Sequence, residues 1–146
     1  VGETDLPSFI MGKQAGIPKI IEFMNDWARE IDNFPKLLVV RYEDLRKDTK
    51  TELARVLSFF GQTPTDAELD DAVSFASVDN MRRMEQENAS KAGAHRSLKP
   101  GDVSDPSSYK VRRAKVGGWR DYVTEEQSDA IDAMVRKTLA PVYGYE

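Results

Sequence analysis

One short apolar run constrains the fold of this chain more than any other feature. Residues 37–42 read Leu-Leu-Val-Val-Arg-Tyr, a nearly continuous apolar stretch that is rich in β-branched side chains. Such a run is typical of a strand that is buried on both faces of a mostly parallel sheet. We therefore predict an α/β fold class with one buried strand at about residues 37–42, in a chain that is otherwise mostly helical.

A buried strand requires partners, because unpaired backbone N–H and C=O groups are costly away from water. The rest of the sequence contains no second convincing strand. Three explanations stay open at this point. The chain is the C-terminal part of a larger α/β domain, or the strand pairs across a dimer, or the run is a core segment that does not form a strand.

Helical patterns surround this run. Apolar residues at three- and four-residue spacing from Ile17 to Ile31 predict an amphipathic helix, with Pro18 in its first turn. A further short helix is predicted over 79–88, with its methionines in the core. Three helices are predicted to begin with a capping box, and Gly61 stands where a C-terminal glycine belongs. The capping pairs are Thr49 with Glu52, Thr65 with Glu68, and Thr124 with Gln127.

Positive charge is concentrated in one segment. The net charge is −4, but residues 91–120 carry eight basic and two acidic side chains, so this segment is +6 and the remainder −10. An acidic chain with one basic segment favours a local anion site over a nucleic-acid surface, where positive charge usually covers a whole face. We therefore expect no nucleic-acid partner.

Other classes are excluded by what the sequence lacks. No apolar run approaches the roughly 18 residues of a membrane span, and the first ten residues show no secretory signal, so we expect a cytoplasmic protein without a membrane partner. Zero cysteines exclude disulfides and thiolate metal sites. The single histidine, His95, argues against a histidine-rich metal site and against a Ser/His/Asp triad.

The basic segment contains a pattern that suits phosphate. Arg112 and Arg113 are adjacent and are followed closely by the pair Gly117 and Gly118. Guanidinium groups make planar, multidentate contacts to phosphate, and glycines allow an anion to approach the backbone. This pattern predicts a phosphate or sulfate site. The preceding residues, 89–109, have no periodicity and are predicted to form a long loop, which in a compact domain is usually functional or mobile.

Residues 112–120, Arg-Arg-Ala-Lys-Val-Gly-Gly-Trp-Arg, resemble the arginine-lysine-glycine-x-x-glycine-x-tryptophan-lysine motif of cytosolic-type sulfotransferases. Three further landmarks of that family occur in the same order: Tyr-Glu-Asp-Leu at 42–45, a helix that ends in Phe-Phe-Gly at 59–61, and the stretch 77–81. The resemblance covers about residues 9–145. It implies that residues 1–146 are the C-terminal portion of a single P-loop-like sulfotransferase domain, without the N-terminal half that carries the phosphosulfate loop.

The resemblance also implies which residues hold the co-substrate, 3′-phosphoadenosine 5′-phosphosulfate (PAPS), and its product PAP. Arg112 would bind the 3′-phosphate through its side chain, with Arg113 and the backbone of Ala114 completing the cradle. Ser77 and Val78 match the family's adenine-contacting stretch, where Val78 replaces a phenylalanine. Ala114 replaces a glycine, so its cost depends on whether its φ is negative or positive.

The family transfers a sulfuryl group from PAPS to a small-molecule hydroxyl or amine acceptor. Its catalytic histidine and its phosphosulfate-loop lysine lie in the N-terminal half, and His95 does not match that histidine, so no catalytic residue is assigned here. The expected function is therefore to supply the 3′-phosphate-binding segment of a sulfotransferase, inactive without the other half. The alternative is a non-catalytic module that binds a nucleotide or a partner and forms a homo-oligomer through its strand.

Overall fold

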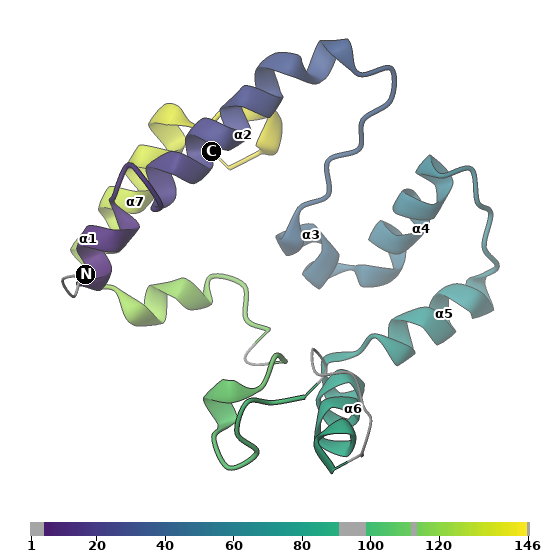
Figure 1. Ribbon diagram of the computed structural model, residues 1–146. Helices are drawn as coiled ribbons and strands as arrows, with labels where there is room; N and C mark the ends of the chain where they lie inside the picture. Colours follow the sequence, from purple (N-terminus) through teal and green to yellow (C-terminus); the bar gives the residue numbers. More distant parts are fainter. Residues whose placement is uncertain (1–4, 91–98, 112–113, 146) are drawn as a thin grey trace. The chain divides into compact units, whose positions relative to one another are not determined.

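The computed structural model describes residues 5–90, 99–111 and 114–145 (Figure 1). The chain divides into two compact units. Unit 1 comprises residues 1–41 and 117–146, and unit 2 comprises residues 42–116. Unit 1 therefore takes its elements from both ends of the chain, whereas unit 2 is one continuous stretch.

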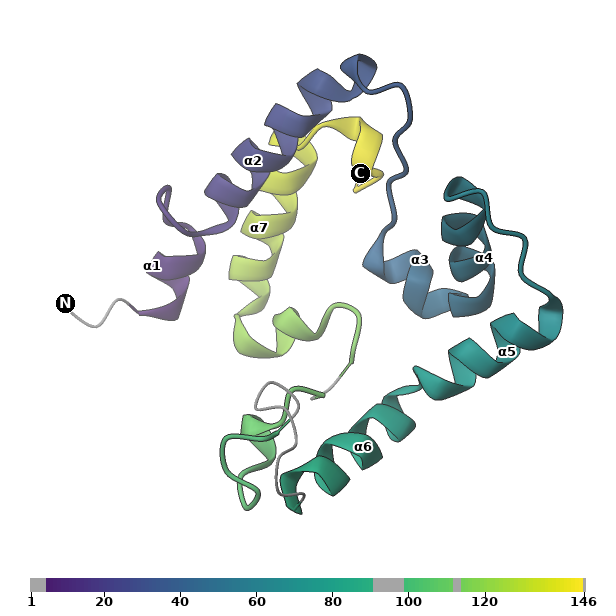
Figure 2. The same cartoon turned by 45° about the vertical axis from the view of Figure 1, so that its right-hand side comes forward.

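Unit 1 is built around a pair of helices, α2 and α7, which lie side by side (Figures 1 and 2). Ile21 of α2 and Ile131 of α7 are the buried apolar side chains described in this unit. Because these side chains leave water, they supply much of its hydrophobic stabilisation. Its elements are α1 (Leu6–Ile10), α2 (Ile17–Glu30), η1 (Ile31–Asn33), η4 (Gly118–Tyr122), α7 (Glu125–Thr138) and η5 (Pro141–Tyr143).

The ends of both helices follow the sequence prediction. Helix α2 carries Pro18 in its first turn, where the missing N–H removes no helical hydrogen bond. Helix α7 begins with the predicted capping box. The hydroxyl of Thr124 accepts from the Gln127 N–H at 3.2 Å, and the Gln127 side chain accepts from the Thr124 N–H at 2.9 Å.

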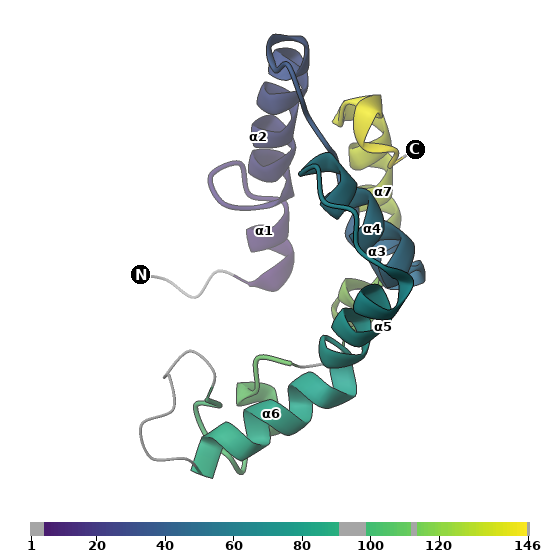
Figure 3. The same ribbon diagram turned by 90° about the vertical axis from the view of Figure 1, so that its right-hand side faces the viewer.

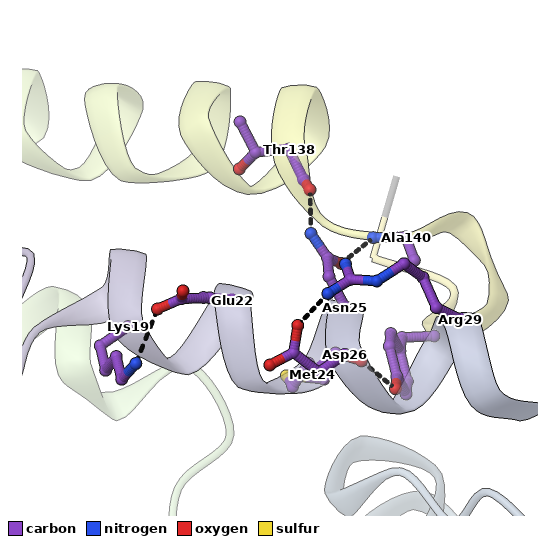
Figure 4. A network of polar contacts seen from close by, with 9 residues as sticks. Lys19, Glu22, Met24, Asn25, Asp26, Arg29, Thr138 and Ala140 are labelled. Carbon is purple, nitrogen blue, oxygen red and sulfur yellow. Dashed lines mark hydrogen bonds and ion pairs between the residues drawn. The ribbon is translucent and has the colours of Figure 1, made fainter.

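A polar clamp joins the C-terminal end of α7 to α2 (Figure 4). The side chain of Asn25 donates to the carbonyl of Thr138 at 2.7 Å and accepts from the N–H of Ala140 at 2.8 Å. The Tyr143 hydroxyl donates to the Met24 carbonyl at 2.6 Å. The bond from Asn25 satisfies the Thr138 carbonyl, one of the last C=O groups that α7 leaves without a helical partner. Together the three bonds are specific for this register of the two helices.

Unit 2 is a succession of helices in which each packs on the next along the chain (Figure 3). Leu69 of α5 is its buried apolar side chain among the described residues. Lys50 at the start of α4 reaches Asp66 at 2.8 Å and Asp70 at 2.6 Å, and the hydrogen bond to Asp66 raises the pKa of Lys50. The elements are α3 (Tyr42–Lys47), α4 (Thr49–Phe59), α5 (Asp66–Phe75), α6 (Val78–Ser90) and η3 (Pro106–Ser108).

The caps of unit 2 match the prediction with one exception. Thr65 and Glu68 form the capping box of α5 as predicted. Gly61 has φ +75° and lies just past α4, where its left-handed backbone closes the helix. The cap of α4 was wrongly predicted at Thr49. Asp48 caps this helix instead, because its carboxylate accepts from the Thr51 N–H at 3.0 Å.

The predicted α/β fold class with a buried strand at residues 37–42 is wrong. Within the described ranges the secondary structure is helical and contains no strand. Residues 37–41 form a connecting segment and Tyr42 begins α3, while Leu37 and Val40 are 42% and 39% exposed. The physical reason is that a strand needs a neighbour to pair with, and the described chain offers none.

Two further properties concern membranes and metals. Of the helices that the structure describes, none combines the length and hydropathy that crossing a bilayer requires. The same residues contain no cluster of three His, Asp or Glu side chains that could hold a metal ion. The methionines predicted for the core, Met81 and Met84, are half-buried on α6.

Candidate functional site

The predicted adenine-contacting residues lie at the N-terminal end of α6 in unit 2. Ser77 directly precedes the helix, and its exposed hydroxyl accepts from the Asn80 N–H at 3.3 Å. The side chain of Asn80 in turn donates to the carbonyl of Phe75 at 2.6 Å. Because the Ser77 oxygen acts as an acceptor here, its O–H remains able to donate to a phosphate oxygen. Val78, half-buried, is the first residue of the helix.

A buried carboxylate on the same helix is bonded to the backbone just before the arginine pair 112–113. Glu85 is only 4% exposed, and its two oxygens accept from the backbone N–H groups of Lys110 and Val111 at 2.6 and 2.9 Å. These are the two residues that precede Arg112 in the sequence. The end of the segment 99–111 therefore lies against α6 at Glu85.

Sequence reasoning missed Glu85, although a signal was present. Glu85 follows Val78 by seven residues and Met81 by four, which places its carboxylate on the apolar stripe of α6. A carboxylate at such a position must be hydrogen-bonded, because burying a charge without partners is very costly. The stripe position therefore predicts a structural partner, which turns out to be two backbone N–H groups.

Ala114, the predicted backbone contact, has φ +48°. It is the one residue other than glycine with a positive φ in the described part of the chain. In this region a Cβ costs conformational energy, so the strained case of the glycine-to-alanine replacement applies. The backbone of the predicted binding loop is therefore strained at Ala114.

The remaining predicted residues fall partly outside the described structure. Arg112, Arg113 and His95 lie outside the described residues, as does the middle of the predicted loop 89–109. The described end of that loop closes on itself, since the N–H of Asp102 donates to the Ser108 hydroxyl at 3.0 Å. The hydrogen bond from the Ser104 hydroxyl lowers the pKa of Asp102, so this carboxylate is ionised at neutral pH.

The glycine half of the motif belongs to unit 1. Gly117 has φ +68° and precedes η4, which contains Trp119 and Arg120. The Arg120 guanidinium lies 4.4 Å from the centre of the Trp119 ring and forms an ion pair with Asp132 of α7 at 2.7 Å. The ion pair joins η4 to α7. Arg120 is thus engaged within its own unit.

The arrangement can be compared with known proteins. A family model described as "Sulfotransferase domain" matches residues 8–142 and so extends over both units. The chain is 29% identical over 121 residues to 3-beta-hydroxysteroid sulfotransferase of Cavia porcellus, covering 82% of this chain and 39% of that protein. It is 31% identical over 136 residues to Sulfotransferase 1C2 of Oryctolagus cuniculus, covering 92% and 43%.

A third relative extends the comparison to another acceptor class. The chain is 25% identical over 137 residues to a protein of Oryctolagus cuniculus named "Amine sulfotransferase", covering 94% of this chain and 44% of the relative. The chain thus spans about two fifths of the length of the curated relatives that it matches.

Proposed function

We propose that this chain, which belongs to the sulfotransferase domain family, supplies the part of a sulfotransferase that grips the 3′-phosphate of PAPS or PAP. The observation that carries the proposal is the bidentate hold of Glu85 on Lys110 and Val111. These bonds attach the two residues that precede the arginine pair to α6, the helix that begins beside Ser77. Ser77 and Val78 thus lie at the start of α6, and Lys110 and Val111 are bonded to Glu85 about 10 Å further along the same helix.

The residue types on this helix and segment fit a phosphorylated nucleoside. Two guanidinium groups at 112–113 can donate paired N–H groups to a phosphate. The left-handed backbone at Ala114 provides a sharp turn next to them, of the kind that lets main-chain N–H groups face an anion. Val78 offers apolar area to adenine without a ring to stack on it.

The proposed reaction is sulfuryl transfer to a small-molecule hydroxyl or amine. When bound, PAPS supplies the sulfuryl group, whose bond from sulfur to the 5′-phosphate oxygen breaks while the acceptor oxygen or nitrogen bonds to sulfur and loses its proton to a base. The described residues would bind and orient the nucleotide. Neither the base nor the phosphosulfate-loop lysine is assigned to them, and we propose that the chain is inactive without the part of the domain that supplies both.

The acceptor class and the location are proposed on the names of the relatives. One relative is named for a hydroxysteroid and another for an amine, so both hydroxyl and amine acceptors are compatible with the family. A cytoplasmic location remains a prediction. The alternative of a module that oligomerises through a strand loses its structural basis, because residues 37–41 form a connecting segment.

The test is a calorimetric titration of the 146-residue chain with 3′,5′-bisphosphoadenosine and with adenosine 5′-monophosphate. We expect tighter binding of the bisphosphate, and we expect Arg112→Ala to abolish this preference because it removes a charge-assisted contact to the 3′-phosphate. Arg136→Ala, an exposed arginine in the last turn of α7, is the matched control. Equal binding of both nucleotides by the unmodified chain would contradict the proposal.

A further inference from the structure

Helix α2 has an apolar side that is wider than one neighbouring helix covers. Successive residues of a helix turn by about 100°, so the apolar stripe from Phe23 round to Ile21 spans roughly 160° of the surface of α2. Ile21 is buried at one edge of this stripe, next to Asn25, which bonds to Thr138 at the end of α7. Phe23 lies at the other edge and is 60% exposed. The part of the stripe that faces away from α7 is therefore exposed in the described structure.

Three aromatic rings form one continuous surface on this exposed part. The rings of Phe23 and Trp27 meet edge to face with 6.4 Å between their centres, and Trp27 stacks on Phe34 at 5.5 Å. Ile20, also exposed, extends the row by one turn toward the start of α2. Aromatic side chains offer large, rigid contact areas and are enriched at the centres of protein interfaces. We call Ile20, Phe23, Trp27 and Phe34 the aromatic face of unit 1.

The charges that border the aromatic face are arranged by sign along the helix. Lys19 lies in the first turn of α2 and Glu30 is its last residue, and both are exposed on the same border of the face. Two copies of α2 packed in parallel would set each of these charges against its like. Antiparallel packing with Phe23 of each copy against Trp27 of the other brings Lys19 beside Glu30 of the second copy, twice by symmetry. Lys19 also pairs with Glu22 at 2.7 Å, but an ammonium group has three donors (Figure 4).

We propose that the aromatic face of unit 1 docks onto the same face of a second copy of this chain, with the two α2 helices antiparallel. An aromatic side chain buries about 150–250 Å² in full, so the exposed parts of the face correspond to roughly 400 Å² per copy and about 800 Å² per dimer. Interfaces below about 1,200 Å² are typical of weak, transient complexes. The dimer is therefore reversible, with a dissociation constant in the micromolar range, and it does not depend on the proposed nucleotide site.

The polar side of α2 argues against a lipid surface as the occupant of this face. Helices that lie on membranes are rich in Lys and Arg on their polar side, because lipid headgroups are often anionic. Here the acidic residues Glu22, Asp26 and Glu30 outnumber Lys19 and Arg29. Both basic side chains are also paired with carboxylates of α2 itself. The charge thus favours a protein surface of mixed sign, such as a second α2.

Sedimentation equilibrium of the 146-residue chain, from about 1 to about 200 μM, tests the proposal. We expect a reversible equilibrium between monomer and dimer. Phe23→Gln is expected to weaken the dimer about tenfold, because it removes a ring from the centre of the contact. The matched control is Phe75→Gln, which makes the same change at a 66% exposed phenylalanine on α5 of unit 2 and is expected to leave the equilibrium unchanged. Equal weakening by both variants would overturn the proposal.

A charge exchange tests the antiparallel arrangement. Lys19→Glu sets two carboxylates against each other across the proposed interface and is expected to weaken the dimer. Adding Glu30→Lys reverses both charges and is expected to restore the dimer. Both changes complement the dipole of α2, so the helix is expected to be retained, which circular dichroism checks. A double variant that keeps its helices but does not recover the dimer would overturn the proposal.

A monomer at every concentration would also overturn the proposal, and two measurements would then identify the occupant of the face. Co-sedimentation of the monomer with vesicles of phosphatidylcholine and phosphatidylglycerol would point to a lipid surface. A monomer that ignores these vesicles would leave the aromatic face for another part of a sulfotransferase domain, since this chain spans about two fifths of the length of its curated relatives.

Discussion

The two units of this chain are held together in different ways. Unit 1 is closed by contacts between residues that lie far apart in the sequence, such as Asn25 with Thr138 and Ala140, around buried Ile21 and Ile131. Unit 2 is a chain of consecutive helices whose neighbours in sequence are also its neighbours in space. Its exception is the Glu85 clamp, which joins α6 to residues 110–111.

This difference indicates which substitutions each unit can tolerate. Unit 1 depends on an apolar contact and a polar clamp that fix one helix register, so the loss of either should be felt throughout that unit. Unit 2, which carries Ser77, Val78 and Ala114, depends on caps and, among the contacts described for it, on the longer-range anchor at Glu85. The strained residue Ala114 and the residues that we propose to bind the nucleotide therefore lie in the unit with the more local architecture.

The largest loss of stability is expected for a substitution in the apolar core of unit 1. Ile21 and Ile20 are adjacent on α2, but Ile21 is 6% exposed and Ile20 is 55% exposed. We expect Ile21→Ala to lower the free energy of unfolding by about 3 kcal/mol, because it leaves a cavity, and Ile20→Ala to cost under about 1 kcal/mol. Denaturant unfolding of both variants measures this. Similar losses in the two variants would mean that the core is elsewhere.

The next largest loss of stability is expected when the polar clamp between α2 and α7 is removed. Asn25→Ala removes two hydrogen bonds and leaves backbone groups at the end of α7 unsatisfied, so we expect a loss of about 2 kcal/mol. Asn33→Ala, which removes only a bond to Glu30 at the end of the same helix region, is the control and should cost much less. Hydrogen exchange should show the loss in unit 1. An equal loss of protection in unit 2 would contradict the claim that this clamp stabilises unit 1 in particular.

A smaller gain is expected in unit 2. Ala114→Gly places glycine at φ +48° and should raise stability by roughly 0.5–1 kcal/mol, since glycine adopts this conformation without a Cβ penalty. The control is Ala67→Gly in the first turn of α5, which should lower stability because glycine disfavours helix. Thermal unfolding distinguishes the two. If Ala114→Gly were as destabilising as Ala67→Gly, the strain at this position would be refuted.

The smallest effect concerns the cap of α5 and its dependence on pH. The hydrogen bond from the Thr65 N–H lowers the pKa of Glu68 from its ordinary value of 4.5. A carboxylate with a depressed pKa stabilises the fold above its unfolded pKa, and this contribution disappears as the pH falls through the folded value. Glu68→Gln keeps the capping box without titrating there. We expect its melting temperature to fall less than that of the unmodified chain on acidification below pH 4.5.

Stability measured at neutral pH provides the reference for this comparison. If Glu68→Gln and the unmodified chain lost stability in parallel on acidification, Glu68 would not contribute, and the acid response would have to come from other carboxylates. Asp48, whose pKa is lowered by the Thr51 N–H at the start of α4, is the next candidate.

The local features of this fold could be predicted from the sequence, and the tertiary ones could not. Spacing and capping residues correctly placed α2, α5 and α7, because helix ends are determined by a few neighbouring side chains. The strand at 37–42 was wrong for a tertiary reason. An apolar β-branched run has the composition of a strand, but whether it forms one depends on a partner that the run does not contain.

In the candidate site, too, the local features could be predicted from the sequence and the tertiary contact could not. The motif pointed to residues 112–114, and the replacement of a glycine by Ala114 indicated in advance where strain could arise, which its φ of +48° now shows. The identity of what holds the segment could not be read from the motif. Glu85 is 25 residues from Lys110, and only the packing of the segment against α6 brings their atoms to 2.6 Å.

The discontinuity of unit 1 has a consequence for synthesis on the ribosome. Helix α2 emerges before its partner α7, from which residues 31–124 separate it. At about 5–20 residues per second, the apolar side of α2 waits roughly 5–19 s before α7 begins to emerge, while unit 2 becomes complete in the meantime. During this interval a chaperone can bind nascent α2.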